Sequence, residues 1–442
     1  MNQQQTTLKP SETDTSLLYP LDASPPPGQS LLLASQWLFL MIPICVIPAS
    51  VLGYAFGLTI GEQAMYLQRI LILTGFMTAT QALVGNRLTL VCGPATVLIV
   101  GYLAAGGGDI YGFSGAMIMG GALLALLGVT GMLRRLLGLF TPNVVAVILI
   151  LVAVSLIPVL TKMAAGMTMN NPSGQPEILI RSVALAMLIV FMSQYLPGFS
   201  RPIAILIGII IGIVVNLALG LKVAPSAAPN ISWLSFPSPI GISGSHYSLS
   251  VLLPFLFCYL ALAVNEVGSV QGMGNLLQVK DLDRRQDRSF ITTGAANLVC
   301  GLFGTIGLVS YSLSPGVVSV TRVASRHVLM LGACLLFLFG LSPRLAYLFS
   351  LIPVEVAGAA MLAILGTQIG AGVAILLRKG NLTARDFLVI GFPVMLGGII
   401  SFLPQDFFVQ WPITLRTLLS NSMVVGVLTV LILEHGLRGR RT

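Results

Sequence analysis

The chain has 442 residues, of which 56% are hydrophobic and only 8% are charged, and its mean hydropathy is +0.95. Soluble globular domains carry about 25% charged residues, so this composition excludes that class and indicates a protein whose solvent is the lipid bilayer. The formal net charge of +9 would suit a nucleic-acid-binding protein if the basic residues formed a patch. They lie instead in the breaks between apolar runs, so we expect no nucleic-acid partner.

Residues 1–30 precede the first apolar run and differ from the rest of the chain. They are polar, contain proline and are mildly acidic. They lack the order of basic and then apolar residues that marks a cleavable signal. We therefore predict a disordered cytoplasmic tail over this range.

From Leu31 almost to the C-terminus, apolar runs long enough to cross a bilayer as helices follow one another. They predict an all-α polytopic membrane protein with fourteen transmembrane segments. The predicted segments are residues 31–53, 64–85, 88–104, 112–133, 143–161, 179–197, 202–220, 249–271, 289–307, 315–325, 327–349, 353–376, 386–403 and 412–434.

The distribution of basic residues supports this topology. With the N-terminus inside, most of the 23 Lys and Arg residues fall on the cytoplasmic side, as the positive-inside rule requires. We therefore expect a multi-pass protein of the cell inner or plasma membrane with both termini in the cytoplasm. The basic residues placed on the other side are Arg69, Lys162, Arg181, Lys222, Arg344 and Arg416.

The third and tenth segments are unusual because each opens with an extended-looking polar stretch before a short apolar helix. The stretches are RLTLVCGP from Arg87 and VSYSLSPG from Val309. They occupy matching places if the chain consists of two sets of seven segments, and an odd number per set means that the second set is inserted upside down. Inverted repeats with interrupted helices at matching places point to the binding site of a transporter near the membrane midplane.

The residues at these two breaks suit such a site. Non-helical backbone at membrane depth must be buried in protein or line an aqueous cavity. We expect Pro94 and Pro315 in the first turn of a helix, and the adjoining Gly93 and Gly316 to permit close backbone approach. Two half-helix N-termini, each carrying about half a positive charge, would then face a polar, planar or anionic ligand. Ordinary proline kinks are the alternative, which the matching positions disfavour.

The eighth segment contains a carboxylate, Glu266, well inside the membrane, in the stretch LALAVNEVGSVQGMGNLL from Leu260. Such a residue is a functional candidate, and since burial favours the neutral carboxyl group, Glu266 could carry a proton. The alternative is a carboxyl group that is hydrogen-bonded within the bundle. Asn265 and Ser269 share a helix face, whereas Glu266 is rotated by about 100° from Asn265. The sequence leaves open which residue of this pair faces the site.

No pattern for a metal, a cofactor or catalysis is present in the sequence. The five cysteines lie in or beside apolar runs, and no pair has metal-ligand spacing. His246, His327 and His435 lie at or beyond the ends of the predicted spans, so a Ser/His/Asp arrangement lacks intramembrane partners. We expect no metal, no cofactor and no enzymatic activity, and a membrane-embedded enzyme is the least favoured class of function.

At these residues the sequence resembles the nucleobase–ascorbate transporter family, the xanthine/uracil permeases. When the number of predicted segments is included, the resemblance extends over nearly the whole chain. Its clearest stretches are NEVGS from Asn265, LSPGVVSVTRVASR from Leu313, LIPVEVAGAAMLAILG from Leu351 and LFTPNVV from Leu139.

The sequence also departs from the family at several places. Against the signature Gln/Glu-Asn-x-Gly-x4-Thr, Gly316 and Thr321 fit, but Leu313 and Ser314 replace the two polar residues. Against the eighth-segment motif Glu-x-x-Gly-Asp/His, alignment on Gly268 places Asn265 at the glutamate and Ser269 at the Asp/His. Trp37 stands where many members have histidine, and Thr293 where aspartate is common. These departures make the chain a divergent member.

The resemblance implies a fold of two inverted seven-segment repeats, with half-helices and short extended stretches in segments 3 and 10. It implies a core domain formed by residues 31–134 and 249–350 and a gate domain formed by residues 135–221 and 351–442, with an external loop at 222–248. It further implies a homodimer in which the core moves against the gate, carrying nucleobases with protons.

The leading hypothesis is therefore a secondary transporter of a nucleobase, a purine of the xanthine type in preference to a pyrimidine, with the proton as coupling ion. The alternative is an anion transporter of the sulfate or carboxylate type with the same fold, favoured by the loss of the polar pair at Leu313 and Ser314. Glu266 is the proton-coupling candidate. The substrate-binding candidates are Trp37, Cys92, Gly93, Asn265, Glu266, Ser269, Leu313, Ser314, Pro315 and Gly316.

Overall fold

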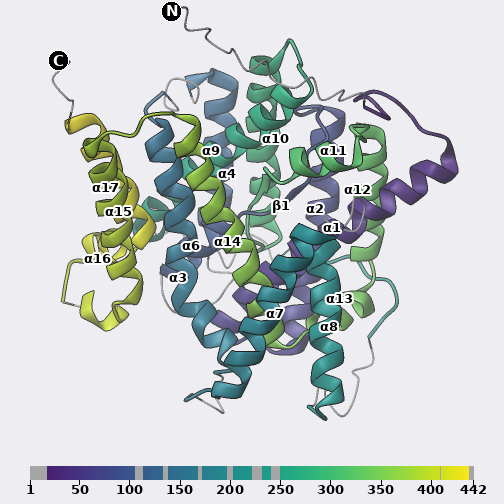
Figure 1. Ribbon diagram of the computed structural model, residues 1–442, viewed down its shortest axis with the longest axis horizontal. Coiled ribbons are helices and arrows are strands. Elements are labelled where there is room, and N and C mark those ends of the chain that lie inside the picture. The colour runs from purple at the N-terminus through teal and green to yellow at the C-terminus, as the bar shows by residue number, and fades with distance from the viewer. Residues whose placement is uncertain are drawn as a thin grey trace, which may run out of the picture.

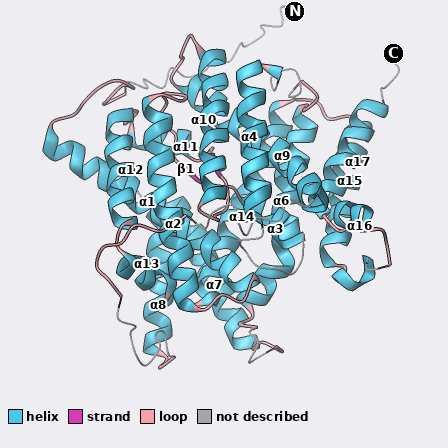
Figure 2. Ribbon diagram, turned by 180° about the vertical axis from the view of Figure 1, so that it is seen from behind, coloured by secondary structure: helices cyan, strands magenta, loops and turns pink. Residues whose placement is uncertain are grey.

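The structure is a computed structural model of the chain, and it describes residues 17–104, 113–132, 138–167, 172–196, 203–221, 231–239, 249–408 and 410–437. Helices run through the whole molecule, and the two short strands of the described residues lie near its centre (Figures 1 and 2). Much of the predicted external loop and residues 1–16 of the predicted tail lie outside the described residues.

The first half of the chain runs from α1 (Pro27–Ala55) through α2 (Ile60–Leu83), β1 (Cys92–Pro94), α3 (Thr96–Ala104), α4 (Ser114–Thr130), α6 (Pro142–Ala164) and α7 (Pro176–Tyr195) to α8 (Ala204–Ala218). The second half has α9 (Leu249–Leu276), α10 (Leu282–Leu302), β2 (Leu308–Ser310), α11 (Ser314–Thr321), α12 (Arg326–Gly340), α13 (Pro343–Ser350), α14 (Val354–Arg378), α15 (Ala384–Phe402), the 3-10 turn η4 (Gln405–Phe408), α16 (Ile413–Leu419) and α17 (Ser422–Gly436).

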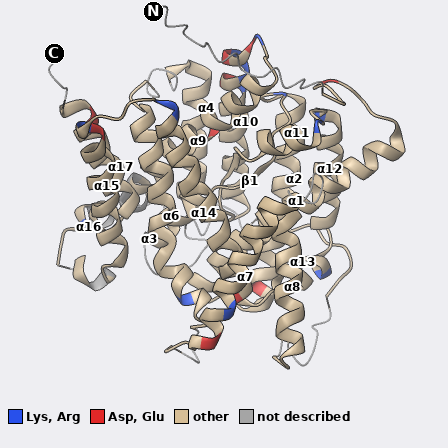
Figure 3. Ribbon diagram, viewed as in Figure 1, with Lys and Arg blue, Asp and Glu red and all other residues tan. Residues whose placement is uncertain are grey.

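Several of these helices span a membrane by length and composition. Among the described residues, α1, α6, α7, α9, α14 and α15 each satisfy that requirement, and α4, α8 and α17 are shorter apolar helices. Charged residues lie mainly toward two opposite ends of the molecule, with a nearly uncharged band between them (Figure 3). The chain is therefore a multi-pass membrane protein, as the composition predicts.

Capping residues explain where several helices begin. Thr59 and Thr383 form capping boxes with Glu62 and Asp386 at the starts of α2 and α15. The Thr141 side chain accepts a hydrogen bond from the backbone of Val144 at the start of α6. Each cap satisfies a backbone N–H group that has no partner within its own helix.

The eleventh predicted segment, residues 327–349, is not a single straight helix. It consists of α12 and α13, which meet at a bend of 88°. Pro343 stands in the first turn of α13. Proline lacks the N–H group that would continue the α12 ladder, so the chain ends one helix and begins another. The fourteenth predicted segment is likewise divided into α16 and α17, where Asn421 caps the second helix.

The helix contacts fall mainly into two groups. α1, α2 and α12 pack together, as do α4, α9 and α10. In the other group α6 packs against α14, α15 and α17, and α7 packs against α8 and α14. Small residues allow the closest pair: a Cβ added to Gly121 would lie 2.5 Å from the backbone nitrogen of Leu298, and one added to Gly294 would lie 2.3 Å from that of Ala125. α4 and α10 can therefore approach with their backbones almost in contact.

Part of the predicted tail is ordered. Tyr19 forms a parallel bridge with Val323, and Ala324 donates a backbone hydrogen bond of 2.8 Å to the carbonyl oxygen of Tyr19. Arg326 forms an ion pair of 2.6 Å with Asp22. The expectation of disorder over residues 1–30 therefore does not extend to this segment, whose backbone is held beside the end of α11.

Candidate functional site

The two predicted breaks meet at the centre of the molecule as a two-stranded antiparallel ladder. β1 pairs with β2 in the register Cys92 with Ser310, Gly93 with Val309 and Pro94 with Leu308. The backbone N–H of Ala95 donates to the carbonyl oxygen of Gly307 at 2.9 Å, extending the pairing beyond one end. The extended backbone at membrane depth is thus paired and buried within protein, which is the condition for its stability there.

A half-helix follows each strand. α3 begins at Thr96 after β1, and α11 begins at Ser314 after β2. Because the strands are antiparallel, the chain enters the two helices from opposite ends of the ladder. Pro315 stands in the first turn of α11, as predicted. Pro94 does not stand in the first turn of α3, because it is the last residue of β1, at the end of the ladder where its missing N–H group is tolerated.

The glycines of the two breaks have different surroundings. A Cβ added to Gly93 would lie 2.4 Å from Cε2 of Tyr311 and 2.5 Å from Cγ2 of Ile44, so only glycine fits there. The hydroxyl group of Tyr311 donates to the carbonyl oxygen of Pro94 at 2.6 Å. A Cβ added to Gly316 would meet no atom within 4 Å. The first break is filled by protein, whereas the second borders open space.

Glu266 is completely buried and contacts β2. Its carboxylate accepts a hydrogen bond of 2.8 Å from the backbone N–H of Ser310 and one of 2.7 Å from the Ser310 hydroxyl group. The hydroxyl group of Ser289 on α10 donates to the same carboxylate. These donors hold the carboxylate within the helix bundle. This is the arrangement that the sequence analysis gives as the alternative to a role as proton carrier.

Ser269 joins Glu266 in holding the strand. Its hydroxyl group donates to the carbonyl oxygen of Ser310 at 2.7 Å, so both backbone hydrogen-bonding groups of Ser310 are bound by α9. We call Glu266 and Ser269 the buried face of α9.

Behind the buried face, polar side chains of α2, the loop after α2 and α10 continue the network. Asn86 donates to the Ser289 hydroxyl group at 3.1 Å, and Gln81 donates to the Thr293 hydroxyl group at 2.9 Å. Thr293 is therefore a member of this network, and it is completely buried. It stands at the position where aspartate is common in the family that the sequence resembles.

The network ends at a pair of charged residues. Arg285 donates to the carbonyl oxygens of Asn86 and Arg87 at 3.1 and 2.8 Å, and it pairs with Asp281 at 2.7 Å. The hydrogen bond from Arg285 lowers the pKa of the Asp281 carboxyl group. Glu266 is thus connected through α10 and the loop after α2 to a charged pair outside the spans.

The adjacent side of α9 borders open space. Gly268 and Gly272 are exposed and Asn265 is partly exposed. A Cβ added to Gly268 would meet no atom within 4 Å, and one added to Gly272 would meet only Cγ of Pro315, at 3.5 Å. We call Asn265, Gly268 and Gly272 the open face of α9. Together with Gly316 and the exposed Leu313 at the start of α11, it forms the candidate site.

The remaining predicted residues lie away from this open space. Cys92 is buried, with its sulfur 3.7 Å from the Ser310 hydroxyl oxygen. The buried hydroxyl group of Ser314 accepts a hydrogen bond of 3.0 Å from the backbone of Val91. Trp37 is 2% exposed and packs against α12, where its Cβ would lie 3.0 Å from a Cβ added to Gly332. The approach of Gly272 to Pro315 thus places the open face of α9 beside the start of α11, whereas the side chains of Cys92, Ser314 and Trp37 are buried.

Sequence reasoning missed Ser310, Ser289, Gln81 and Asn86, which hold the break from behind. The available signal was their polarity inside or beside apolar spans. Each is completely buried in the structure, and a buried polar side chain within a membrane needs a partner.

The protein is helical and multi-pass, and at its centre one of two antiparallel strands precedes each half-helix. This arrangement defines the class of membrane transporters. The chain belongs to the xanthine/uracil permeases, since the family model described as Permease family matches residues 28–406.

Similar proteins extend over most of the chain. It is 28% identical over 417 residues to a uric acid transporter of Escherichia coli, covering 92% of this chain and 86% of the relative. It is 27% identical over 413 residues to a uric acid permease of Bacillus subtilis, covering 91% of each. A xanthine permease of Bacillus subtilis is 26% identical over 415 residues, covering 92% and 93%.

Solved structures share the fold at lower identity. The transmembrane domain of a cyanobacterium bicarbonate transporter superposes with a TM-score of 0.58 at 15% identity, covering 89% of this chain and 96% of that one. The murine Solute Carrier 26 family member A9 anion transporter, in its inward-facing state, gives a TM-score of 0.57 at 13% identity, covering 92% and 69%. These likenesses establish the architecture of the polytopic helical bundle.

Proposed function

We propose that this protein is a permease for an oxidised purine base of the uric acid or xanthine type. The observation that carries the proposal is that Gly268 of α9 and Gly316 of α11 border open space, beside the partly exposed Asn265 and the start of a half-helix. Relatives along nearly the whole chain are named as uric acid and xanthine permeases. An oxopurine is planar and carries alternating N–H and C=O groups, which an amide side chain and backbone groups can match without a fixed charge.

In this proposal Asn265 binds the base from the position at which the family motif has glutamate. Its amide can donate and accept at once, so it can bind adjacent groups on the edge of a base. Glu266 and Ser269 position the strand behind the site and do not contact the base. Leu313 and Gly316 would contact its face and its edge.

The fourteen-segment inverted repeat and the two domains belong to the same proposal. The antiparallel pairing of β1 with β2 supports two half-helices of opposite direction. The two groups of helix contacts support a core built from α1–α4 and α9–α13 and a gate built from α6–α8 and α14–α17. We propose that the core carries the base past the gate in an elevator-like movement, in a homodimer within the cell inner membrane and with both termini cytoplasmic.

We also propose that Glu266 carries the coupling proton. In the ionised state its carboxylate accepts from all its partners, whereas protonation converts one oxygen into a donor and changes the bonds to Ser310 and Ser289. Protonation thereby acts on β2, which leads into the half-helix at the site.

Uptake by cells that lack their own purine permeases tests the substrate. We expect radiolabelled uric acid or xanthine to accumulate, and each base to compete with the other, while uracil competes weakly. Asn265→Ala should raise KM about tenfold through the lost hydrogen bonds. Asn275→Ala, an exposed position on the same helix, is the control and should leave KM unchanged. Uptake that no nucleobase inhibits would overturn the proposal.

Glu266→Gln tests the coupling separately. The glutamine retains an acceptor for Ser310 but cannot exchange a proton, so accumulation driven by a pH gradient should be lost while exchange of labelled for unlabelled base persists. Accumulation that survives this substitution would exclude Glu266 as the proton carrier.

An anion transporter is the second candidate. Leu313 offers no polar group and the Ser314 hydroxyl group is engaged by the backbone of Val91, so few side-chain ligands for a base remain at the start of α11. A site dominated by helix dipoles would suit a small anion. Labelled sulfate and bicarbonate in the same uptake assay distinguish the two candidates.

A further inference from the structure

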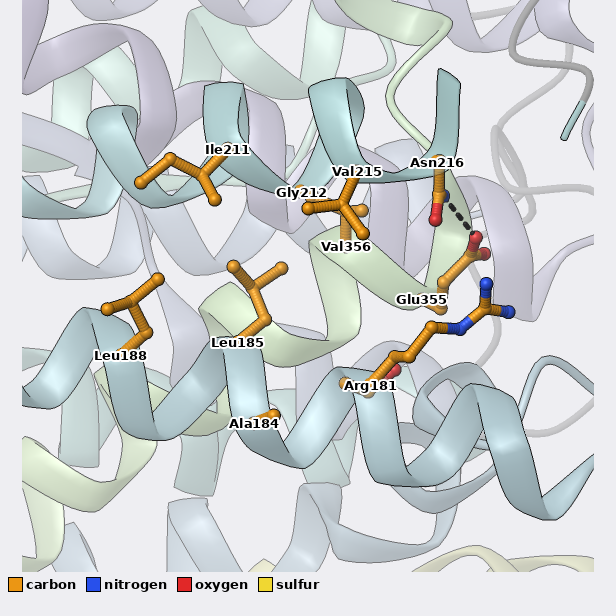
Figure 4. Close-up of a pocket in the computed structure, with 11 residues that line it drawn as sticks. Arg181, Ala184, Leu185, Leu188, Ile211, Gly212, Val215, Asn216, Glu355 and Val356 are labelled. Carbon is orange, nitrogen blue, oxygen red and sulfur yellow. Dashed lines mark hydrogen bonds between the residues drawn. The ribbon is translucent and has the colours of Figure 1, made fainter. Parts of the chain in front are cut away.

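A cavity separate from the candidate site opens between α7, α8 and the start of α14. Its volume is about 220 Å³. One end is lined by the apolar side chains of Leu185, Leu188, Ile211 and Val215. At the other end the side chains of Arg181, Asn216 and Glu355 gather from the three helices (Figure 4). The cavity is therefore amphipathic.

The polar end contains groups whose hydrogen-bonding capacity is not used by the described residues. The Nε atom of Arg181 and the hydroxyl oxygen of Ser182 are buried without a hydrogen-bond partner among those residues, and Ser182 is only 2% exposed. Glu355 accepts one hydrogen bond, of 2.7 Å, from Asn216. A buried hydroxyl group without a partner is unfavourable, so a ligand that supplies the partner is favoured.

The position of the cavity indicates what that ligand is. Arg181 lies in the second turn of α7, Asn216 lies near the end of α8 and Glu355 is the second residue of α14, so these polar side chains stand near helix ends. The surrounding surface of α7 and α8 exposes large apolar side chains, including Ile180, Met187, Val214 and Leu217, each more than half exposed. Such a surface faces lipid, so the cavity opens to the bilayer with its polar end near the headgroups.

We propose that this cavity binds a membrane phospholipid with a phosphoethanolamine headgroup. The phosphate accepts from the Arg181 guanidinium group and the Ser182 hydroxyl group, and the primary ammonium group donates to the Glu355 carboxylate. One acyl chain lies along Leu185, Leu188 and Ile211. A lipid with a phosphoglycerol headgroup offers no cation for Glu355, and a trimethylammonium group has no N–H donor. The bound lipid joins α7 and α8 to α14.

Native mass spectrometry of the purified full chain tests this inference. The probes are phosphatidylethanolamine, phosphatidylglycerol and phosphatidylcholine with identical acyl chains. We expect the wild type to retain phosphatidylethanolamine about tenfold better than the Arg181→Met variant does. Glu355→Gln should abolish the preference over phosphatidylglycerol, and Arg181→Lys should retain an intermediate affinity.

Two further variants locate the lipid. Ala184 lines the cavity, so Ala184→Phe fills it and should lower the retention of every lipid. Lys162→Met removes an exposed cation at the end of α6, on the same predicted side of the membrane, and should retain lipid as the wild type does. Equal retention by the wild type, Arg181→Met and Ala184→Phe would overturn the proposal. A second result would also overturn the proposal: two copies of the Leu188→Cys variant become cross-linked in a preparation that binds no lipid. A second copy of the chain, and not a lipid, would then cover the cavity.

Discussion

The two faces of α9 at the level of the breaks have opposite environments, although they belong to the same turns of one helix. Glu266 and Ser269 are buried and hold both backbone groups of Ser310. Asn265, Gly268 and Gly272 border open space. With about 100° per residue, the open-face residues span roughly 60° and Ser269 lies only about 40° beyond them. The buried face and the open face are therefore less than half a turn of helix apart. We expect substitutions on the buried face to lower the stability of the protein and substitutions on the open face to lower transport.

The largest effect is expected on the buried face, for Glu266→Ala. The substitution leaves the buried N–H of Ser310 and two hydroxyl groups without their acceptor. Each unsatisfied group costs about 1–3 kcal/mol, so we expect a total loss of about 3 kcal/mol or more and a strongly lowered melting temperature in detergent. Asn275→Ala is the control on the same helix. A melting temperature equal to that of the wild type would show that the carboxylate does not hold β2.

Gly93→Ala should give the next largest effect. The new methyl group would lie 2.4 Å from the Tyr311 ring and 2.5 Å from Ile44, and overpacking of this kind costs about 1–3 kcal/mol. Gly316→Ala, at the matching break, adds its methyl group to open space and should melt as the wild type does. Equal destabilisation by the two substitutions would contradict the contrast between the filled and the open break.

The sequence predicted the breaks because glycine and proline interrupt apolar runs at two matching places. It could not predict which break is filled, because that depends on Tyr311 and Ile44, which approach Gly93 from a neighbouring strand and from α1. The position of Pro94 in a strand also depends on pairing with Leu308, which is far away in the chain.

The helical period separated Asn265 from Glu266 but did not identify the face that borders the site. Both faces carry small and polar residues, so polarity alone does not orient the helix. The orientation is determined by the donors that surround Glu266, and these come from α10 and β2. Trp37 was placed in the site by resemblance to a family histidine, yet it is buried against α12.

On the open face, Gly268→Val should affect transport while leaving the fold intact. The side chain enters space in which a Cβ meets no atom within 4 Å, so the melting temperature should not change. It competes with the substrate for that space, and a mismatch of a single methylene in a pocket already changes specificity about 10–200-fold. We therefore expect at least a tenfold fall in kcat/KM for uric acid uptake.

Gly391→Val is the matched control for Gly268→Val. Gly391 is exposed on α15, and a Cβ there also meets no atom within 4 Å. Uptake kinetics equal to those of the wild type are expected. If both variants lost uptake equally, the loss would reflect a general effect of valine in these helices and not occupation of the site.

The smallest effect is expected at the far end of α11, where the ordered N-terminal segment is held mostly by backbone groups. Leu18 donates to the carbonyl oxygen of Arg322 at 2.9 Å, and Arg326 donates to that of Leu21 at the same distance. The Asp22 side chain is 70% exposed in its ion pair with Arg326, and exposed pairs contribute about 0–1 kcal/mol. Asp22→Asn should therefore leave uptake unchanged and lower the melting temperature by no more than a degree or two.

Arg326→Met should lower the melting temperature further than Asp22→Asn does. Arg326 also donates to the carbonyl oxygen of Ala82, near the end of α2, at 3.0 Å. Equal losses of stability for the two variants would show that the ion pair, and not the backbone pairing, holds the segment in place.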